Sequence, residues 1–214
     1  MTAARVIQKI WLSSRTYKLR TERTQSRIRA GQCFSVGTSD LGINREYSMY
    51  SGASDNHLDF LIRKIDDGIV SSRLAQCQEG DLVQLSGPFG DFCLREEDIA
   101  QKHFVFIASG TGIAPFHSFA LTYTELKFTL YHGVRHEDEL YDSGDYKKGS
   151  YLSAISAPRD GSPGTRVTDL LRNASLPTNS LYYLCGNQKM IVDAIKVLRD
   201  SGVHGGSIFT ETFF

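Results

Sequence analysis

Short apolar or alternating stretches, separated by turn residues, fill the first 95 residues of the chain. They predict strands over residues 5–12, 15–20, 33–37, 46–51, 58–64 and 81–86, with turns at Gly80-Asp81 and Gly87-Pro88. A helical pattern interrupts them at residues 71–77, where the hydroxyl of Ser71 suits an N-cap. Six short strands at this spacing predict a small antiparallel β-barrel.

The pattern changes after residue 102, where apolar runs alternate with helical periodicity. Strands are predicted over residues 104–108, 128–134, 151–156, 180–185 and 207–213, and helices from residue 114 and over 165–173 and 188–200. This alternation is typical of a Rossmann-like α/β domain, here with a five-stranded parallel sheet. A charged break lies at residues 95–103, so the sequence predicts two domains, residues 1–98 and 99–214.

Charge is unevenly distributed, although the chain of 214 residues is formally neutral. Residues 1–30 contain eight Lys or Arg residues and a single acid, Glu22. This region is either a solvated strand face or an electropositive docking surface for an acidic partner. The pattern alone leaves both readings open.

The cysteines and histidines are scattered along the chain. Cys33, Cys77, Cys93 and Cys185 form no Cys-x-x-Cys pair, so neither a zinc site nor an iron–sulfur cluster is expected. Free thiols, no signal-peptide pattern and no apolar run of membrane-spanning length together favour the cytoplasm. Neither a Ser-His-Asp arrangement nor a nucleic-acid-binding motif is legible, and no nucleic-acid or membrane partner is expected.

A run of residues suited to a dinucleotide overlaps the expected strand at 46–51, namely Arg45-Glu46-Tyr47-Ser48-Met49. Arg45 can grip a diphosphate with two N–H groups, and Tyr47 can stack on a flat ring. Ser48 adds a small hydroxyl that can approach a polar ring edge. Together these groups suit a ligand that carries both a diphosphate and a flat ring system.

Two glycine-containing segments suit phosphate groups. Gly68 permits a close turn before Ser71 and Ser72, at the start of the predicted helix. The segment Gly110-Thr111-Gly112 follows a buried strand, and Pro115 lies in the first turn of the next helix, where its missing N–H is harmless. Helix N-termini favour phosphates, although a plain cap or a tight turn explains the same residues.

Two further motifs follow in the second half. Cys185-Gly186-Asn187 precedes Met190, and the chain ends in Glu211-Thr212-Phe213-Phe214. Each alone is explained by burial at a strand end. Together and in this order, all these motifs resemble the ferredoxin–NADP reductase family of flavoproteins, over nearly the whole chain.

The resemblance implies an FAD-dependent NAD(P)H oxidoreductase. It implies FAD contacts for Arg45, Tyr47, Ser48, Met49, Gly68, Ser71 and Ser72, and nicotinamide dinucleotide contacts for Gly110, Thr111, Gly112, Pro115, Gly186, Asn187 and Met190. Three catalytic roles are also implied: Ser48 orients the flavin edge, Cys185 positions the nicotinamide, and Glu211 manages proton and charge near flavin N5. An aromatic ring of the tail covers the flavin in this family, and between Phe213 and Phe214 we favour Phe213.

The choice of nucleotide depends on arginines. A 2′-phosphate favours two or three guanidinium groups, and Arg135, Arg159 and Arg166 are the candidates. The family has Ser-Arg after its third strand, whereas this chain has Ser156-Ala157, so Arg159 comes two positions late. We favour NADPH slightly over NADH.

The activity implied by the resemblance is hydride exchange between NAD(P)H and FAD. Single electrons then pass to or from a small redox protein, and the basic N-terminal region favours an acidic one such as ferredoxin or flavodoxin. Alternatives are the reductase component of an oxygenase system, a reductase of free flavins or ferric chelates, and a non-enzymatic electron-transfer subunit of a larger complex.

Overall fold

The chain folds into two compact units in the computed structural model, which describes residues 2–24 and 27–213. One unit comprises Met1–Cys93 and Ala114–Thr122, and the other comprises Leu94–Ile113 and Tyr123–Phe214. Helix α3 (Ala114–Thr122) thus belongs to the first unit, although it follows the first strand of the second. A single cut in the sequence therefore does not separate the units, and the domain limits at residues 98 and 99 stay a proposal.

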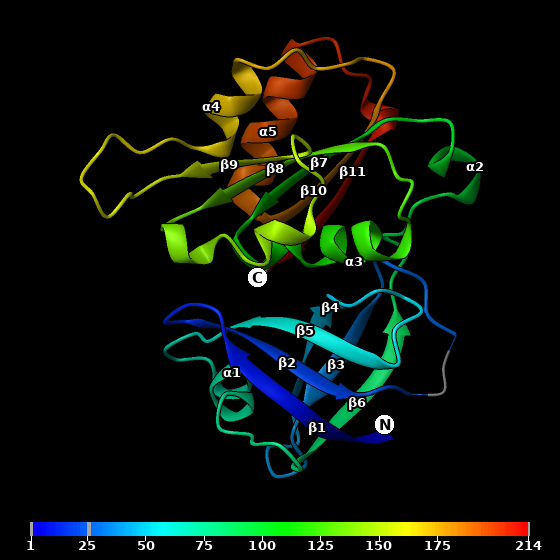
Figure 1. The fold of residues 1–214 in the computed structure, drawn as a ribbon, viewed down its shortest axis with the longest axis vertical. Coiled ribbons are helices and arrows are strands. Elements are labelled where there is room, and N and C mark those ends of the chain that lie inside the picture. Colours follow the sequence, from blue (N-terminus) through cyan, green and yellow to red (C-terminus); the bar gives the residue numbers. More distant parts are fainter. Residues whose placement is uncertain (1, 25–26, 214) are drawn as a thin grey trace. The chain divides into compact units, whose positions relative to one another are not determined.

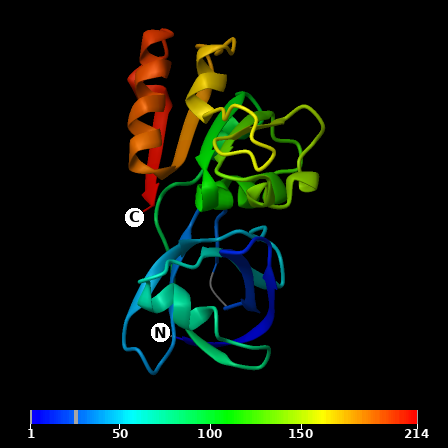
Figure 2. The same cartoon turned by 90° about the vertical axis from the view of Figure 1, so that its left-hand side faces the viewer.

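An antiparallel sheet of six strands forms the first unit (Figure 1). The strands are β1 (Thr2–Trp11), β2 (Thr16–Glu22), β3 (Cys33–Gly37), β4 (Asn44–Ser48), β5 (His57–Arg63) and β6 (Leu82–Phe89), in the order β4-β3-β6-β1-β2-β5. A bridge between Met49 and Phe60 joins the two ends of this order, and Figure 2 shows the strands curling into a barrel. All six predicted strands are confirmed, with small shifts at their ends.

The barrel core is filled by alternate residues of the strands, because successive side chains of a strand point to opposite faces. Its fully buried members include Leu19, Phe34, Val36 and Phe60, and the rings of Phe34 and Phe60 meet edge-on at 5.9 Å. The short helix α1 (Ile69–Leu74) adds two apolar residues to this core.

Helix α1 begins earlier than the sequence pattern predicted. Gly68, whose backbone is extended, is the N-cap, and Ser71 lies inside the helix. The predicted capping role of Ser71 is therefore wrong. Its hydroxyl instead accepts a hydrogen bond from the N–H of Ile65, at 3.1 Å, in the turn that leads into the helix.

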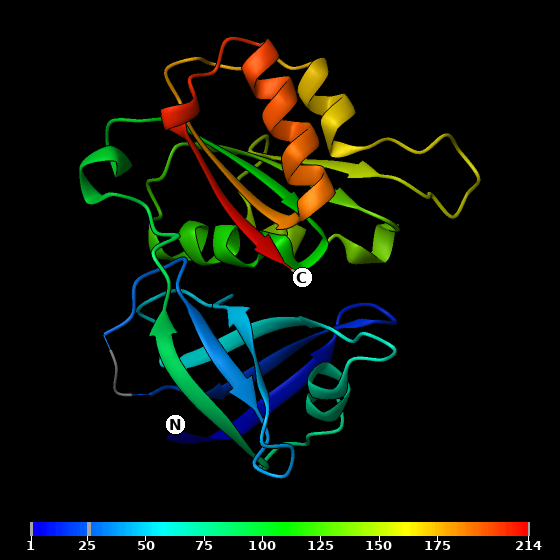
Figure 3. The ribbon, with the colours of Figure 1, turned by 180° about the vertical axis from the view of Figure 1, so that it is seen from behind.

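A parallel sheet of five strands forms the second unit, as predicted. Its strands are β7 (Phe104–Ser109), β8 (Phe128–Val134), β9 (Tyr151–Ile155), β10 (Leu181–Asn187) and β11 (Ile208–Phe213), in the order β11-β10-β7-β8-β9. Helices α4 (Val167–Arg172) and α5 (Gln188–Asp200) cover one face of this sheet (Figure 3). Shorter elements are α2 (Glu96–Ile99) and the 3₁₀ helices η1 (Gly110–Ile113), η2 (Glu137–Glu139), η3 (Ser143–Asp145) and η4 (Gly205–Ser207).

The two faces of the parallel sheet differ in character. Val105 and Ile107 on β7 pack with residues of α4 and α5. Phe106 and its neighbours on the other face form an aromatic layer, in which Tyr183 of β10 stacks on Phe209 of β11 with 4.6 Å between ring centroids. Because side chains alternate along each strand, residues two positions beyond Tyr183 and Phe209 also lie on this second face.

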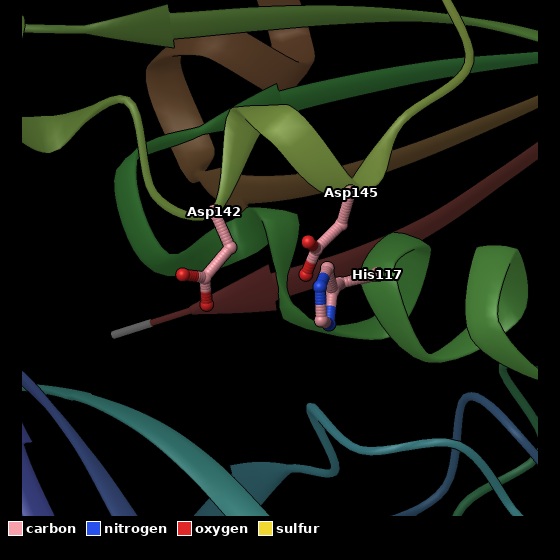
Figure 4. Close-up of side chains that lie close together, drawn as sticks. All are labelled: His117, Asp142 and Asp145. Carbon is pink, nitrogen blue, oxygen red and sulfur yellow. The ribbon is translucent and has the colours of Figure 1, made fainter.

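Helix α3 is held in the first unit by a histidine. The ring of His117 stacks on Tyr50 with 3.9 Å between centroids, and its Nδ1–H donates to the Tyr50 carbonyl oxygen at 2.7 Å. Figure 4 shows the side chain of His117, and also those of Asp142 and Asp145 at the two ends of η3. Among the described residues, no helix is both long and apolar enough to cross a bilayer.

Candidate functional site

Strand β4 carries the first group of candidate flavin-binding residues. Arg45 is exposed, and its Nη1 donates to the carbonyl oxygen of Asn44 at 3.0 Å. Tyr47 is half-buried against the barrel core, and this burial raises its pKa to about 12. Ser48 is buried opposite Cys33 of β3. One short strand therefore offers a guanidinium group, an aromatic ring and a hydroxyl.

Met49 lies directly after β4 and has a structural part in the barrel. Its side chain is fully buried in the core, and its N–H donates to the carbonyl oxygen of Gln32 at 3.0 Å. These contacts hold the end of β4 in place. Contact of Met49 with a flavin stays a prediction from the resemblance.

The second group of candidate flavin-binding residues lies around the start of α1. A Cβ added to Gly68 would come within 2.8 Å of Ile65 Cβ, so this close turn needs glycine. The hydroxyl of Ser72 donates to the Ile65 carbonyl oxygen at 3.1 Å, while that of Ser71 bonds within the same turn. Both serines therefore fix the turn through their hydroxyl groups, and contact of this turn with a phosphate stays a prediction from the resemblance.

An ion pair connects these two groups. Arg73 Nε of α1 lies 2.8 Å from Asp40 Oδ2, in the connection between β3 and β4. Residues that are far apart in the sequence are thus carried by neighbouring elements of one unit. The exposed guanidinium of Arg45 and the glycine turn at Gly68 are groups of the kind that bind a diphosphate, such as that of the FAD that the resemblance implies.

The candidate residues for binding the nicotinamide dinucleotide lie at the carboxyl edge of the parallel sheet. After β7 the chain turns into η1, where Gly110 has a φ of 52°. A Cβ on Gly112 would come within 2.4 Å of the Cys185 carbonyl oxygen, so this position also needs glycine. Thr111 lies between them, and the buried Pro115 follows in α3. This turn lies at the switch point of the strand order, between β7 and β10, where open α/β sheets bind ligands.

The turn after β10 is fixed to the same edge. Gly186 has a φ of 131°, and a Cβ there would lie 2.4 Å from Ser109 Oγ. Ser109 Oγ accepts from the N–H of Asn187 at 2.9 Å. Asn187 Oδ1 in turn caps α5 by accepting from the N–H of Lys189 at 3.0 Å and, more weakly, from that of the half-buried Met190.

Cys185 and Glu211 form the most specific pair of the site. They are opposite each other on β10 and β11, and Cys185 Sγ lies 3.8 Å from Glu211 Oε2. Burial first, and then the Glu211 carboxylate, raise the pKa of the Cys185 thiol well above its ordinary value. The thiol is therefore protonated and donates to the carboxylate. A neutral thiol can position a substrate but is no nucleophile.

Of the two candidate rings in the C-terminal tail, the structure describes that of Phe213. Phe213 ends β11, is half-buried and is paired with Asn187 of β10. Phe214 lies outside the described residues. The preference for Phe213 as the ring that covers the flavin stays a prediction.

The three candidate arginines all follow the carboxyl ends of strands. Arg135 comes after β8, Arg159 after β9, and Arg166 is the N-cap of α4. Arg159 Nη2 lies 2.9 Å from Asp138 Oδ2, so its guanidinium group already has an ion-pair partner. Within the described part of the chain, the side chains of Arg135 and Arg166 make no ion pair with a carboxylate.

Sequence reasoning missed two residues that shape this edge, Ser109 and Asp138, and it assigned a third, His132, only an ordinary polar or partly buried role. Ser109 joins the turns after β7 and β10, and Asp138 engages Arg159. His132 is fully buried, and its Nε2 lies 2.9 Å from the Gly110 carbonyl oxygen. A sequence signal for such a role was the position of His132 in an apolar strand before Gly133, since a polar residue there is normally satisfied by a buried partner.

An antiparallel barrel, joined in one chain to a parallel sheet with a glycine turn at its switch point, is the two-domain arrangement that the resemblance leads us to expect for binding FAD and NAD(P). Family models agree. The model for an oxidoreductase FAD-binding domain matches residues 4–93, and that for an oxidoreductase NAD-binding domain matches residues 106–196. The chain belongs to the ferredoxin–NADP reductase family.

Individual relatives cover the chain to different extents. The electron transfer component of toluate 1,2-dioxygenase from Pseudomonas putida is 30% identical over 197 residues, which are 86% of this chain and 58% of that protein. The chain therefore spans less than two thirds of this curated relative.

Two solved structures are similar in fold. The Amycolatopsis cytochrome P450 reductase GcoB has a TM-score of 0.86 at 24% identity, covering 99% of this chain and 69% of that one. A ferredoxin NADP⁺ reductase from Neisseria gonorrhoeae, solved with FAD and NADP, has a TM-score of 0.82 at 23% identity, covering 100% of this chain and 98% of that one. At these identities the likeness concerns the fold.

Proposed function

We propose that this chain transfers hydride between NAD(P)H and FAD and then exchanges single electrons with a small redox protein. The observation that carries this proposal is the Cys185–Glu211 pair, fixed at the switch point beside the Gly110–Gly112 turn. Bound FAD supplies the conversion between a two-electron donor and one-electron acceptors. The protein supplies alignment, which the tight packing at this edge supports.

The residues have separate tasks in this proposal. Arg45 binds the flavin diphosphate, Tyr47 stacks beside the ring system, and Ser48 hydrogen-bonds the flavin edge. Cys185 positions the nicotinamide through its neutral thiol, and Glu211 manages the proton and charge near flavin N5. The half-buried Phe213 is the ring that covers the flavin and is displaced when the nicotinamide binds.

NADPH is the better donor in this proposal, with a modest margin over NADH. The exposed guanidinium groups of Arg135 and Arg166 support this preference, because a 2′-phosphate binds best to unpaired guanidinium groups. Arg159 adds little to this preference for NADPH while it is paired with Asp138.

The electron partner in this proposal is an acidic carrier of the ferredoxin or flavodoxin type. Several N-terminal arginines are already paired with acids, as in Arg15 with Asp66 at 2.9 Å and Arg20 with Asp59 at 2.8 Å. These pairs reduce the attraction that the sequence alone suggests. We therefore expect turnover with a protein acceptor to fall moderately, not steeply, as salt rises.

A second candidate is the reductase component of an oxygenase system. The name of the Pseudomonas putida relative, an electron transfer component of a dioxygenase, favours it. Both candidates share the reductive half-reaction and differ only in the acceptor.

An anaerobic titration tests the shared half-reaction. The purified protein, loaded with FAD, is titrated with NADPH and separately with NADH while its visible flavin band is followed. Bleaching of the band supports the proposal, and the lower Kd identifies the donor. A protein that cannot be loaded with FAD, or whose band neither nucleotide bleaches, would contradict it.

A further inference from the structure

A fully buried histidine lies in the same row of the parallel sheet as the Cys185–Glu211 pair. Glu211 is opposite Cys185, Cys185 is opposite Ala108 of β7, and Ala108 is opposite His132 of β8. Residues paired in a parallel sheet present their side chains to the same face. His132 therefore rises on the face that carries Cys185, with only the small side chain of Ala108 between them.

Both ring nitrogens of His132 have partners within the unit. Nε2 lies 2.9 Å from the Gly110 carbonyl oxygen, and Nδ1 lies 2.8 Å from the hydroxyl oxygen of Tyr151 on β9. A carbonyl oxygen only accepts, so Nε2 must carry the proton. Nδ1 must then accept from the Tyr151 O–H. Burial lowers the pKa of His132 to about 4, which keeps this one tautomer neutral near pH 7.

The tyrosine is held in turn by a neighbouring ring. Tyr151 stacks on Tyr146 with 5.1 Å between centroids and 10° between ring planes. Three consecutive groups, from the Tyr151 hydroxyl through the imidazole to the Gly110 carbonyl, thus form a chain of hydrogen bonds. It runs across the sheet from β9 to the turn after β7.

The hydrogen bond from His132 to the Gly110 carbonyl oxygen fixes the direction in which the backbone N–H groups of the turn point. In a trans peptide the C=O and the following N–H point in opposite directions. With the Gly110 carbonyl held by His132, the N–H of Thr111 points away from the buried imidazole. N–H groups in the first turn of a helix have no partner within it and suit a phosphate. On the other side, the Cys185 carbonyl oxygen leaves no room for a Cβ on Gly112.

We propose that His132 is a positioning residue for the diphosphate of the nicotinamide dinucleotide, acting through the Gly110 carbonyl and supported by Tyr151. This inference rests on the proposed function, because it assumes that NAD(P)H binds at the switch point. Without the imidazole, the peptide between Gly110 and Thr111 loses its anchor. The N–H donors then have to be ordered by the ligand itself, at a cost in affinity.

Calorimetry on the oxidised, FAD-loaded protein tests the proposal by a readout separate from turnover. The ligand is NADP⁺ or NAD⁺, whichever binds the parent protein more tightly. His132→Phe keeps the ring shape without donors, and we expect its Kd to rise about tenfold, the effect of losing one buried hydrogen bond. His132→Gln, which can restore an N–H donor near the Nε2 position, should recover most of this loss.

Stopped-flow reduction separates positioning from general damage. In His132→Phe we expect the limiting rate of flavin reduction to fall by less than about threefold, so that the loss lies in binding. Tyr151→Phe, which removes only the hydroxyl, should weaken binding in the same sense and serves if His132→Phe does not fold.

The outcomes are distinct. An unchanged Kd in His132→Phe, or in Tyr151→Phe where that variant stands in, overturns the inference. The inference is also overturned if His132→Gln binds the dinucleotide no more tightly than His132→Phe. It is likewise overturned if His132→Phe lowers only the limiting rate of flavin reduction. If the parent protein itself neither binds a dinucleotide nor is reduced by one, the proposed function fails and the inference fails with it.

Discussion

Cys185 and Glu211 are directly opposed on neighbouring parallel strands, and the thiol donates a hydrogen bond of 3.8 Å to the Glu211 carboxylate. Neither residue depends on a long flexible loop, because β10 and β11 are both anchored in the sheet. The pair therefore has a fixed geometry, and the raised pKa of Cys185 means that its proton stays on sulfur at neutral pH. A fixed neutral donor is suited to aligning a nicotinamide ring.

We first predict that Cys185→Ala keeps FAD but loses hydride transfer by about 100-fold, because small misplacements of reacting groups cost that much. Its flavin content should match the parent, since the candidate FAD residues of β4 and α1 lie in the other unit. Stopped-flow reduction by NAD(P)H measures the rate. Cys93→Ala removes another buried cysteine side chain that forms no disulfide, and it should leave the rate unchanged. A Cys185→Ala rate equal to that of the parent would show that the thiol has no positioning role.

Gly112→Ala should weaken dinucleotide binding and stability together. Its Cβ would come within 2.4 Å of the Cys185 carbonyl oxygen, a backbone atom that cannot move aside cheaply. We expect a loss of about 1–3 kcal/mol in unfolding free energy. Gly144→Ala is the matched control, because a Cβ there has nothing within 4 Å. Equal melting temperatures for the two variants would argue against close packing at Gly112.

Asp138→Asn should shift the nucleotide preference toward NADPH. The substitution removes the carboxylate that lies 2.9 Å from Arg159 and so releases a guanidinium group for a 2′-phosphate. We expect the ratio of kcat/KM for NADPH over NADH to rise about tenfold, comparable to a single charge-assisted hydrogen bond. Asp193→Asn, an exposed position on α5, controls for the change in net charge. The prediction is wrong if both variants change the ratio equally.

Asp59→Ala should destabilise the barrel much more than Asp66→Ala. Asp59 is buried and receives two hydrogen bonds of 2.8 Å from Arg20, whose pKa is raised mainly by this contact. Removing one partner of such a pair costs about 3 kcal/mol. Asp66 pairs with Arg15 where both side chains are more than half exposed, so its loss should cost less than about 0.5 kcal/mol. Urea unfolding of the two variants measures the difference.

The pH dependence of stability should carry a signature of His132. Burial lowers its pKa from 6.5 to about 4, so between these values the unfolded chain binds a proton that the folded chain does not. Its contribution to stability is fully present above about pH 6.5 and is lost as the pH falls toward 4, by up to about 3 kcal/mol. The stability of His132→Gln should therefore approach that of the parent as the pH falls. A difference that stays constant from pH 7 to 4.5 would contradict this.

Much of the architecture was readable from local patterns. The strands at 33–37 and 128–134 were predicted to the residue, because alternation or a short apolar run identifies a strand without knowledge of its neighbours. The two glycines Gly110 and Gly112, directly after a buried strand, likewise indicated a tight turn without knowledge of its neighbours. The start of α1 was misjudged, since a glycine in extended conformation can replace a serine as N-cap.

The partnerships of side chains were not readable in this way. The sequence determined which residue types are available, such as Cys185, Glu211, His132 and Arg159, and the order in which they occur. Only the tertiary structure decided that Glu211 faces Cys185, that His132 holds the Gly110 carbonyl and that Asp138 occupies Arg159. Strand order and register bring these groups together over distances in the chain that no local pattern spans, and contact within a few ångströms then sets their charge and hydrogen bonding.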